Sequence, residues 1–180
     1  MIAVTGGNAH IGMIVSDTDD SAQRLRMEGF LSAINPHKNM IVEETFESRS
    51  DRIRIRKLVS GMLQDNKRIN AIFCADQTAA DMLGDILQEE GYSKNNMKVV
   101  CFGMSREIYK YLQDGTYTFS VMNDTVEMGY QAVKTLKDCI NGKSGEKRIV
   151  YTEIENADKD FDFESWKAEW ENRERSCMMS

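Results

Sequence analysis

The sequence predicts an α/β fold, a three-layer αβα lobe in which helices cover both faces of a mainly parallel sheet. Two observations predict it. Short apolar runs alternate with longer amphipathic stretches along the chain, which is typical of strands joined by right-handed helical crossovers. The chain also has 180 residues, of which 41% are hydrophobic and only one is Pro, so its length suits one domain with a buried core.

Six short segments have the apolar pattern of strands, bounded by polar residues or Gly. The expected strands are residues 2–5, 40–44, 71–75, 98–102, 117–122 and 147–153. Six longer segments show the three- and four-residue apolar spacing of amphipathic helices. The expected helices are residues 22–34, 53–65, 78–90, 107–113, 125–140 and 163–175. Asp124 precedes the fifth of these helices as an N-cap.

Parallel sheets bind ligands in the loops at the carboxyl ends of their strands. These loops are expected at residues 6–20, 76–78, 103–105 and 123–124. We expect residues 1–154 to form a ligand-binding lobe with a hinge strand and a hinge helix. Residues 155–180 are then an acidic linker followed by a C-terminal helix.

Composition excludes several classes of function. The net charge is −6, which argues against nucleic-acid binding by this segment. No apolar run approaches the roughly 18 residues of a membrane span, and the N-terminus lacks the pattern of a signal peptide. The four Cys lie far apart, without metal-ligand spacing, and are expected to be reduced thiols of a cytoplasmic protein. No catalytic triad is visible, and we expect no enzyme activity, cofactor, metal or membrane partner.

Five segments, taken in order, resemble one known family. They are Ser-Ala-Gln-Arg-Leu-Arg-Met-Glu-Gly-Phe at 21–30, Ala-Ile-Phe-Cys-Ala-Asp-Gln-Thr-Ala at 71–79, Val-Val-Cys-Phe-Gly at 99–103, and the stretches 112–121 and 123–133. They are similar, at matching spacing, to the second half of the lac-repressor and type I periplasmic-binding-protein-like ligand-binding domain. The resemblance covers about residues 2–142.

The resemblance implies one lobe of a two-lobed domain that closes around a small molecule such as a sugar. In that family an output domain, often a helix-turn-helix DNA reader, responds to the closure. We therefore expect the sensor domain of a lac-repressor-type transcriptional regulator or a related signalling protein, as a fragment of a longer chain. Its expected partners are the small-molecule ligand and the first lobe or output domain of that chain.

The resemblance also indicates the ligand-binding residues. Arg26 stands where the family has an arginine that binds ligand hydroxyls or a carboxylate, and Asn123 where it often has Gln, Asn or Asp. Asp76 follows the third expected strand. The family's strand-end aspartate falls on Gly103, and its turn asparagine falls on Ala75. Because both polar groups are missing, we expect a ligand less polar than a simple sugar, or a loss of ligand binding.

Each polar candidate also has a purely structural interpretation. Arg26 is alternatively a solvated arginine beside Arg24 on a helix surface. Asp76 alternatively caps the helix that follows it, and Asn123 alternatively joins Asp124 in capping the hinge helix. The sequence leaves these alternatives open.

A short-chain dehydrogenase is the alternative function. Residues 5–12, Thr-Gly-Gly-Asn-Ala-His-Ile-Gly, resemble the phosphate loop of those NAD(P)-dependent oxidoreductases, and Tyr130 and Lys134 supply a Tyr-x-x-x-Lys pair. Against this, His10 stands where the pattern needs Gly so that the backbone can approach the pyrophosphate. A phosphorylated receiver domain is disfavoured because Thr5, Gly6 and Gly7 stand where an acidic pair is needed.

The hinge helix at 125–140 has an apolar stripe, made of Val126, Met128, Ala132, Val133, Leu136 and Ile140. An uncovered stripe of this kind drives association, so we expect the helix either to fold back onto its own lobe or to pair two chains as a homodimer. Trp166 and Trp170 lie on one side of the terminal helix, which we expect to be peripheral.

Overall fold

The structure is a computed structural model that describes residues 1–143 and 149–178, with side chains as far as residue 173. Two compact units make up the chain. The first consists of Met1–Val121 with Asn156–Asp160, and the second of Met122–Glu155 with Phe161–Ser180.

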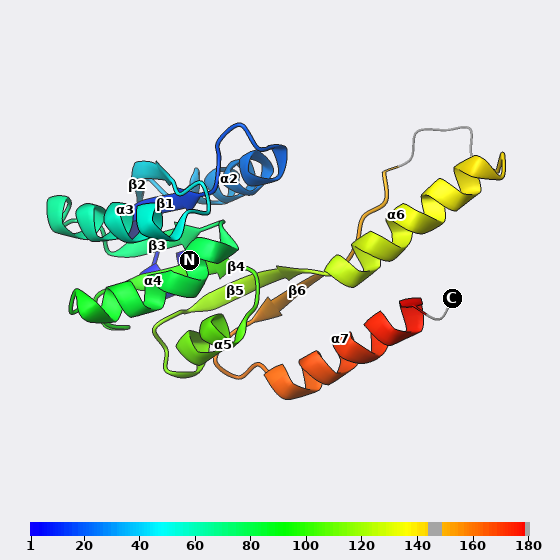
Figure 1. Ribbon diagram of the computed structural model, residues 1–180. Helices are drawn as coiled ribbons and strands as arrows, with labels where there is room; N and C mark the ends of the chain where they lie inside the picture. Colours follow the sequence, from blue (N-terminus) through cyan, green and yellow to red (C-terminus); the bar gives the residue numbers. More distant parts are fainter. Residues whose placement is uncertain (144–148, 179–180) are drawn as a thin grey trace. The chain divides into compact units, whose positions relative to one another are not determined.

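A single six-stranded sheet runs through the fold in the order β2-β1-β3-β4-β5-β6 (Figure 1). The pairs β1–β2, β1–β3, β3–β4 and β4–β5 are all parallel. The strands are β1 (Asn8–Val15), β2 (Asn39–Glu47), β3 (Ala71–Cys74), β4 (Lys98–Phe102), β5 (Phe119–Asn123) and β6 (Ile154–Ala157). The predicted α/β class with a mainly parallel sheet is confirmed.

Helices alternate with the strands along the chain. They are α1 (Ile2–Thr5), α2 (Ser21–Ile34), α3 (Arg52–Asp65), α4 (Gln77–Glu89), α5 (Arg106–Gln113), α6 (Thr125–Ile140) and α7 (Phe163–Met178). The two faces of β1 contact different helices. Ala9, Ile11 and their alternate neighbours pack with Ile34 of α2, whereas the space beside Gly12 is filled by Met62 of α3. The lobe therefore has three layers, as predicted.

A row of aromatic rings forms the core beneath α2. Phe30 of α2 stacks on Phe73 of β3 with ring centroids 4.1 Å apart, and Phe73 meets the ring of Phe102 edge-on at 5.9 Å. Aromatic contacts of this geometry stabilise a fold beyond the burial of apolar area alone. The row connects the middle of the sheet to the end of β4.

The first strand is in a different place from the prediction. Residues 2–5 form α1 rather than a strand, and β1 lies within the segment predicted as the loop 6–20. Gly6 and Gly7, with φ of 60° and 75°, turn the chain between α1 and β1. The alternate residues Ala9, Ile11 and Met13 are fully buried, and their burial outweighs the polar and glycine content that made the segment look like a loop.

The last strand is also misplaced. Of the predicted strand 147–153, residues 147 and 148 lie outside the described residues, and 149–153 are not in a strand. The strand β6 begins at Ile154 instead and runs into the predicted acidic linker, with Ala157 buried. The polar residues Glu155 and Asn156 interrupt the apolar pattern that predicts a strand. An edge strand such as β6 tolerates polar side chains. The predicted boundary between lobe and linker at residue 154 stays a prediction.

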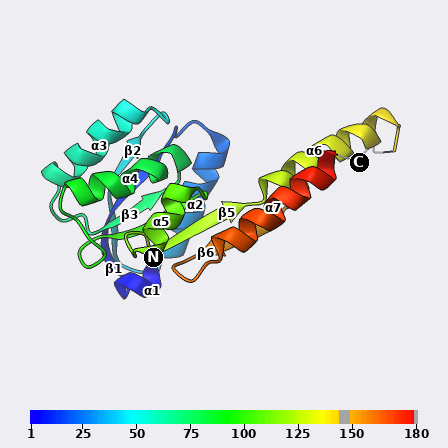
Figure 2. The same ribbon diagram turned by 60° about the horizontal axis from the view of Figure 1, so that its bottom comes forward.

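The second unit contains α6 and α7, which lie side by side (Figure 2). The Arg173 guanidinium donates to Asp124, which also caps α6 by accepting from the Glu127 backbone N–H at 2.9 Å. Trp166 and Trp170 stack with centroids 6.5 Å apart. The predicted terminal helix is confirmed. In the described part of the chain, no helix combines the length and apolarity needed to cross a membrane.

Cys74 and Cys101 are neighbours on β3 and β4 and are both buried. Burial raises the pKa of the Cys101 thiol to about 12 and that of Cys74 well above its usual value. Both thiols are therefore protonated and unreactive near neutral pH, because the thiolate is the reactive form. Cys139 on α6 is exposed.

Gly84 and Gly61 form a matched pair for testing the packing of α4. A Cβ atom at Gly84 would lie 2.5 Å from the Tyr111 ring, whereas one at Gly61 in α3 would meet nothing within 4 Å. We expect Gly84→Ala to lower the free energy of unfolding by about 1–3 kcal/mol through overpacking. Gly61→Ala should raise it by up to about 1 kcal/mol through helix propensity. Urea unfolding followed by circular dichroism measures both, and equal effects would contradict the packing.

The apolar side of α6 is exposed in the single chain, with Val133 at 67% and Leu136 at 60% exposure. Both the folding back of this helix and the pairing of two chains through it stay predictions. We expect Val133→Asp with Leu136→Asp to make a dimer dissociate in sedimentation velocity without loss of stability. Lys134→Asp is the control, since it changes the charge equally on the same helix. A wild type that is monomeric at high concentration would contradict this pairing.

Candidate functional site

Four loops meet where β1, β2, β3 and β4 end, and we call this side of the sheet the carboxyl edge. Its residues are 16–20, 48–51, 75–76 and 103–105. Parallel strands bring their carboxyl ends together, so the edge collects side chains from distant parts of the sequence. The loop after β2 was missing from the sequence-based prediction, and it supplies several of the contacts described below.

Arg26 of α2 is anchored at this edge. Its Nη1 donates to the Ala75 carbonyl at 2.9 Å, and its guanidinium carbon lies 4.7 Å from the centre of the Phe102 ring. Burial lowers the pKa of Arg26, although the charges of Asp20 and Asp76 act in the opposite direction. The interpretation of Arg26 as a solvated arginine is therefore wrong. The neighbouring Arg24 is the exposed arginine of this helix.

Asp76 is buried, with 4% exposure, at the start of α4. One carboxylate oxygen accepts from the Thr78 backbone N–H at 3.1 Å and from the Ser50 hydroxyl at 3.2 Å. The other oxygen accepts from the Ser48 hydroxyl. Asp76 therefore caps α4, as its structural interpretation predicted, and holds the loop after β2. Direct ligand binding by Asp76 stays a prediction.

Gly103 follows β4 with a φ of 99°, a conformation that favours glycine. A Cβ atom there would lie 2.5 Å from Oε1 of Gln77 and 2.7 Å from its Cδ. The Gln77 side chain donates through Nε2 to the Met104 carbonyl at 3.3 Å. An amide thus fills the space in which a side chain at position 103 would begin. The sequence analysis did not single out Gln77, and only the spatial arrangement identifies it.

Asn123 is the exposed last residue of β5 and belongs to the second unit. The cap of α6 is formed by Asp124, whose Oδ1 accepts from the Glu127 N–H. Binding of a ligand by Asn123 stays a prediction.

The loop after β2 is strained and tightly held. Arg49 and Ser50 have φ of 55° and 51°, in the left-handed region where residues other than glycine cost about 1–3 kcal/mol each. Arg49 donates to Asp17 and, at 2.8 Å, to Glu47. The Thr18 hydroxyl and backbone N–H also donate to Glu47, and these bonds lower its pKa. Strain of this kind concentrates at functional sites.

His10 on β1 contacts an acidic side chain of β2. Its Nδ1 lies 2.5 Å from Oε1 of Glu43, and the other Glu43 oxygen accepts from Arg68 at 2.9 Å. The hydrogen bond from His10 lowers the pKa of Glu43. The register of β1 against β2 skips Glu43 between Val42 and Glu44, so a β-bulge directs this carboxylate toward His10.

The dehydrogenase interpretation does not match this geometry. Residues 5–12 span the end of α1 and the start of β1, whereas a dinucleotide phosphate loop joins the end of a strand to a helix. Both His10 and Gly12 lie inside β1 and pair with β2.

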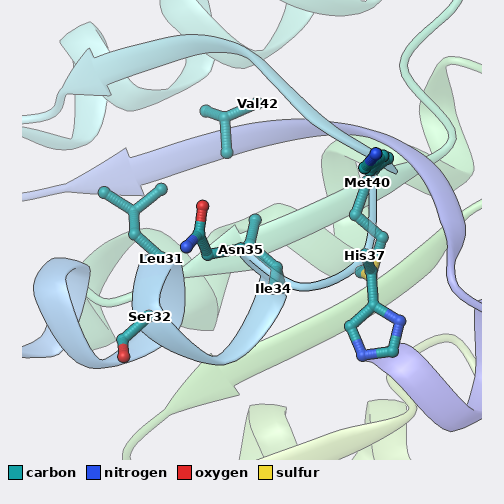
Figure 3. Close-up of a pocket in the computed structure, with 8 residues that line it drawn as sticks. Leu31, Ser32, Ile34, Asn35, His37, Met40 and Val42 are labelled. Atoms are coloured by element: carbon teal, nitrogen blue, oxygen red, sulfur yellow. The ribbon is translucent and has the colours of Figure 1, made fainter.

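A surface pocket of about 540 Å³ lies at the amino end of β2, away from the carboxyl edge, between the end of α2 and the start of β2 (Figure 3). Its lining includes Leu31 of α2, Val42 of β2 and His37 between these two elements. None of the predicted ligand-binding residues lines it. The pocket is therefore separate from the carboxyl edge.

The fold and the carboxyl edge define a class of protein: an α/β lobe with polar groups at the ends of its parallel strands. Comparison of the sequence with protein families gives the same result. Residues 1–144 match the periplasmic binding protein domain. The chain therefore belongs to the periplasmic binding protein domain family, as the resemblance implied. No curated protein shows significant sequence similarity to it.

Several solved structures share the fold. The glucose-galactose binding protein GanP from Geobacillus stearothermophilus is 24% identical, with a TM-score of 0.82, over 88% of this chain and 56% of that chain. An ABC transporter solute-binding protein from Burkholderia graminis, in complex with D-arabinose, is 23% identical, with a TM-score of 0.83, over 89% of this chain and 56% of that one. At these identities the similarity shows the fold alone.

A third example comes from Agrobacterium vitis, an ABC transporter solute-binding protein bound with α-D-tagatopyranose. It is 20% identical, with a TM-score of 0.84, over 94% of this chain and 56% of that chain. The chain thus spans a little over half the length of the solved proteins that it matches.

The bonds of Asp76 can be tested against another helix cap. Asp76→Ala removes the cap of α4 and leaves the Ser48 hydroxyl buried without its acceptor, so we expect a loss of about 2–4 kcal/mol in the free energy of unfolding. Asp51→Ala removes the exposed cap of α3, which accepts from the Arg54 N–H at 2.7 Å, and should cost only about 1 kcal/mol. Equal losses in urea unfolding would show that the serine bonds contribute nothing.

Proposed function

We propose that the protein is a small-molecule-binding lobe that takes a sugar or a sugar derivative at its carboxyl edge. The observation that carries this proposal is Arg26, a half-buried guanidinium anchored to Ala75 and Phe102 at the ends of β3 and β4. One of its five N–H donors is used by Ala75, and the others are suited to a polar ligand. The solved structures named above, which bind glucose or galactose, D-arabinose and tagatose, support the same ligand class.

The proposed mechanism is binding without chemistry. A ligand held between this lobe and a second lobe favours the closed arrangement by its higher affinity for it, and the shift in population is the signal. The pre-formed loops support this role, because Arg49, Glu47 and Asp76 hold the edge in one conformation without ligand. A pre-organised site loses less conformational entropy on binding. The dehydrogenase alternative gains no support from the comparisons.

Two kinds of whole protein contain such a lobe. We propose the sensor of a cytoplasmic regulator of the lac-repressor type, on the resemblance of the five sequence segments. The second candidate is the solute-binding protein of an ABC transporter, which the similar solved structures favour. The reading frame on both sides of this segment distinguishes them, since a regulator encodes a DNA-binding or other output domain.

The proposal is tested by titrating the chain with neutral sugars and sugar acids while recording its two-dimensional 1H–15N NMR spectrum. We expect saturable shifts at the carboxyl edge. Arg26→Ala should weaken binding about tenfold or more, because hydrogen bonds to charged groups contribute about 1.5–3 kcal/mol. Arg24→Ala is the control, since Arg24 is exposed and pairs only loosely with Glu28 at 3.8 Å. If no compound of either kind binds at millimolar concentration, the proposed function is wrong.

A further inference from the structure

We propose that the surface pocket at the amino end of β2 (Figure 3) is a second ligand site, which takes a small aliphatic carboxylate. The pocket lies away from the carboxyl edge, so the inference does not depend on the proposed function. It is carried by an aliphatic floor, by a lining without acidic residues, and by polar side chains that have no bonding partner in the described part of the chain.

The pocket has the size and the floor of a small-molecule site. Its volume of about 540 Å³ lies within the range of roughly 300–1,000 Å³ that is typical of such sites. Ile34 and Met40 line it and belong to the buried core, with 5% and 7% exposure. Leu31 and Val42 add two more aliphatic side chains. Since none of the eight described residues that line it is aromatic, the lining suits an alkyl group, to which a flexible methionine side chain can adapt.

Backbone hydrogen bonds fix the wall of the pocket between α2 and β2. The His37 N–H donates to the Ile34 carbonyl at 2.8 Å, and the Met40 N–H donates to the His37 carbonyl at 2.9 Å. Pro36 restricts the chain within this turn. A pocket held in this way loses little conformational entropy when a ligand enters. The bond to Ile34 also occupies a carbonyl at the end of α2, which would otherwise repel an anion.

The lining of the pocket is positively charged. Lys38 carries the permanent charge, and none of the described lining residues is acidic, although the chain has 29 Asp and Glu against 23 Lys and Arg. Lys38 is exposed and forms no ion pair within the residues that the structure describes. Its ammonium is a compact point charge with three donors. It therefore suits a single carboxylate at the mouth of the pocket.

Three further polar side chains line the pocket and are unused. Ser32 and Asn35 are exposed and His37 is half-buried, and in the described part of the chain none of these side chains takes part in a hydrogen bond. The hydroxyl and the amide can each donate to a carboxylate oxygen. Together with the aliphatic floor, these donors define a ligand with a short alkyl body and an anionic head.

The test titrates the full 180-residue chain with three probes of equal chain length, hexanoate, hexanamide and hexylammonium. We expect hexanoate to cause saturable shifts at Leu31, Asn35 and Val42 in the 1H–15N NMR spectrum. Its affinity should exceed that of hexanamide about threefold to fivefold, because an ion pair at a protein surface contributes modestly. Hexylammonium should bind most weakly, and the preference for hexanoate should decrease as NaCl is raised.

Two pairs of variants test the lining. Lys38→Gln should reduce the affinity for hexanoate to that for hexanamide, whereas Lys57→Gln, at an exposed lysine of α3 outside the pocket, should have no effect. Leu31→Ser should weaken the binding of hexanoate and hexanamide about fivefold, because it removes an apolar wall. Leu25→Ser is the matched control, since Leu25 is exposed on the same helix and does not line the pocket.

Several outcomes would overturn the inference. These are the absence of saturable binding by hexanoate, an affinity for hexanamide equal to that for hexanoate, and shifts confined to the carboxyl edge. Shifts that follow the protein concentration rather than the probe concentration would show that a second chain occupies the pocket instead. No sugar takes part in these measurements, so their result is separate from that for the proposed function.

Discussion

The row of aromatic rings from Phe30 through Phe73 to Phe102 links the core of the lobe to its carboxyl edge. Phe30 and Phe73 stack in the layer beneath α2, and Phe102 continues the row to the end of β4. Arg26 lies over the last ring of this row. Because Phe30 and Arg26 are one helical turn apart on α2, the packing that holds the helix on the sheet also sets the position of the guanidinium.

The parallel sheet imposes the second constraint. The loops at the carboxyl edge lie beyond the ends of the paired strands. Backbone and side-chain hydrogen bonds hold them there. Ser48 and Arg49 donate their backbone N–H groups to Val15 and Ser16 at 2.8 Å, and Asp76 accepts from the serines on either side of Arg49. These bonds offset the strain of two left-handed residues. The chain's own contacts therefore hold this edge in place.

Gly103 and Gln77 shape the end of β4 together. Gly103 has no side chain, and the side chain of Gln77, from the first turn of α4, occupies the adjoining space. The side chain of Gln77 is exposed and is not part of the core.

The sequence by itself determined the class of fold and the elements with a strong period. The helix at 125–140 and the strand at 98–102 have the predicted bounds, since their caps and apolar spacing are local signals. The sequence also placed Asp76 directly after the third strand, whereas Arg26 was indicated by the family resemblance. Tertiary structure decided the rest. β1 is a strand because its side chains are buried on both faces of the sheet. β6 is a strand, despite its polar residues, because it is the outermost strand beside β5. Gln77 lies against Gly103, which is 26 positions away in the sequence, and Arg49 bonds to Asp17, which is 32 positions away. No local sequence pattern records such contacts.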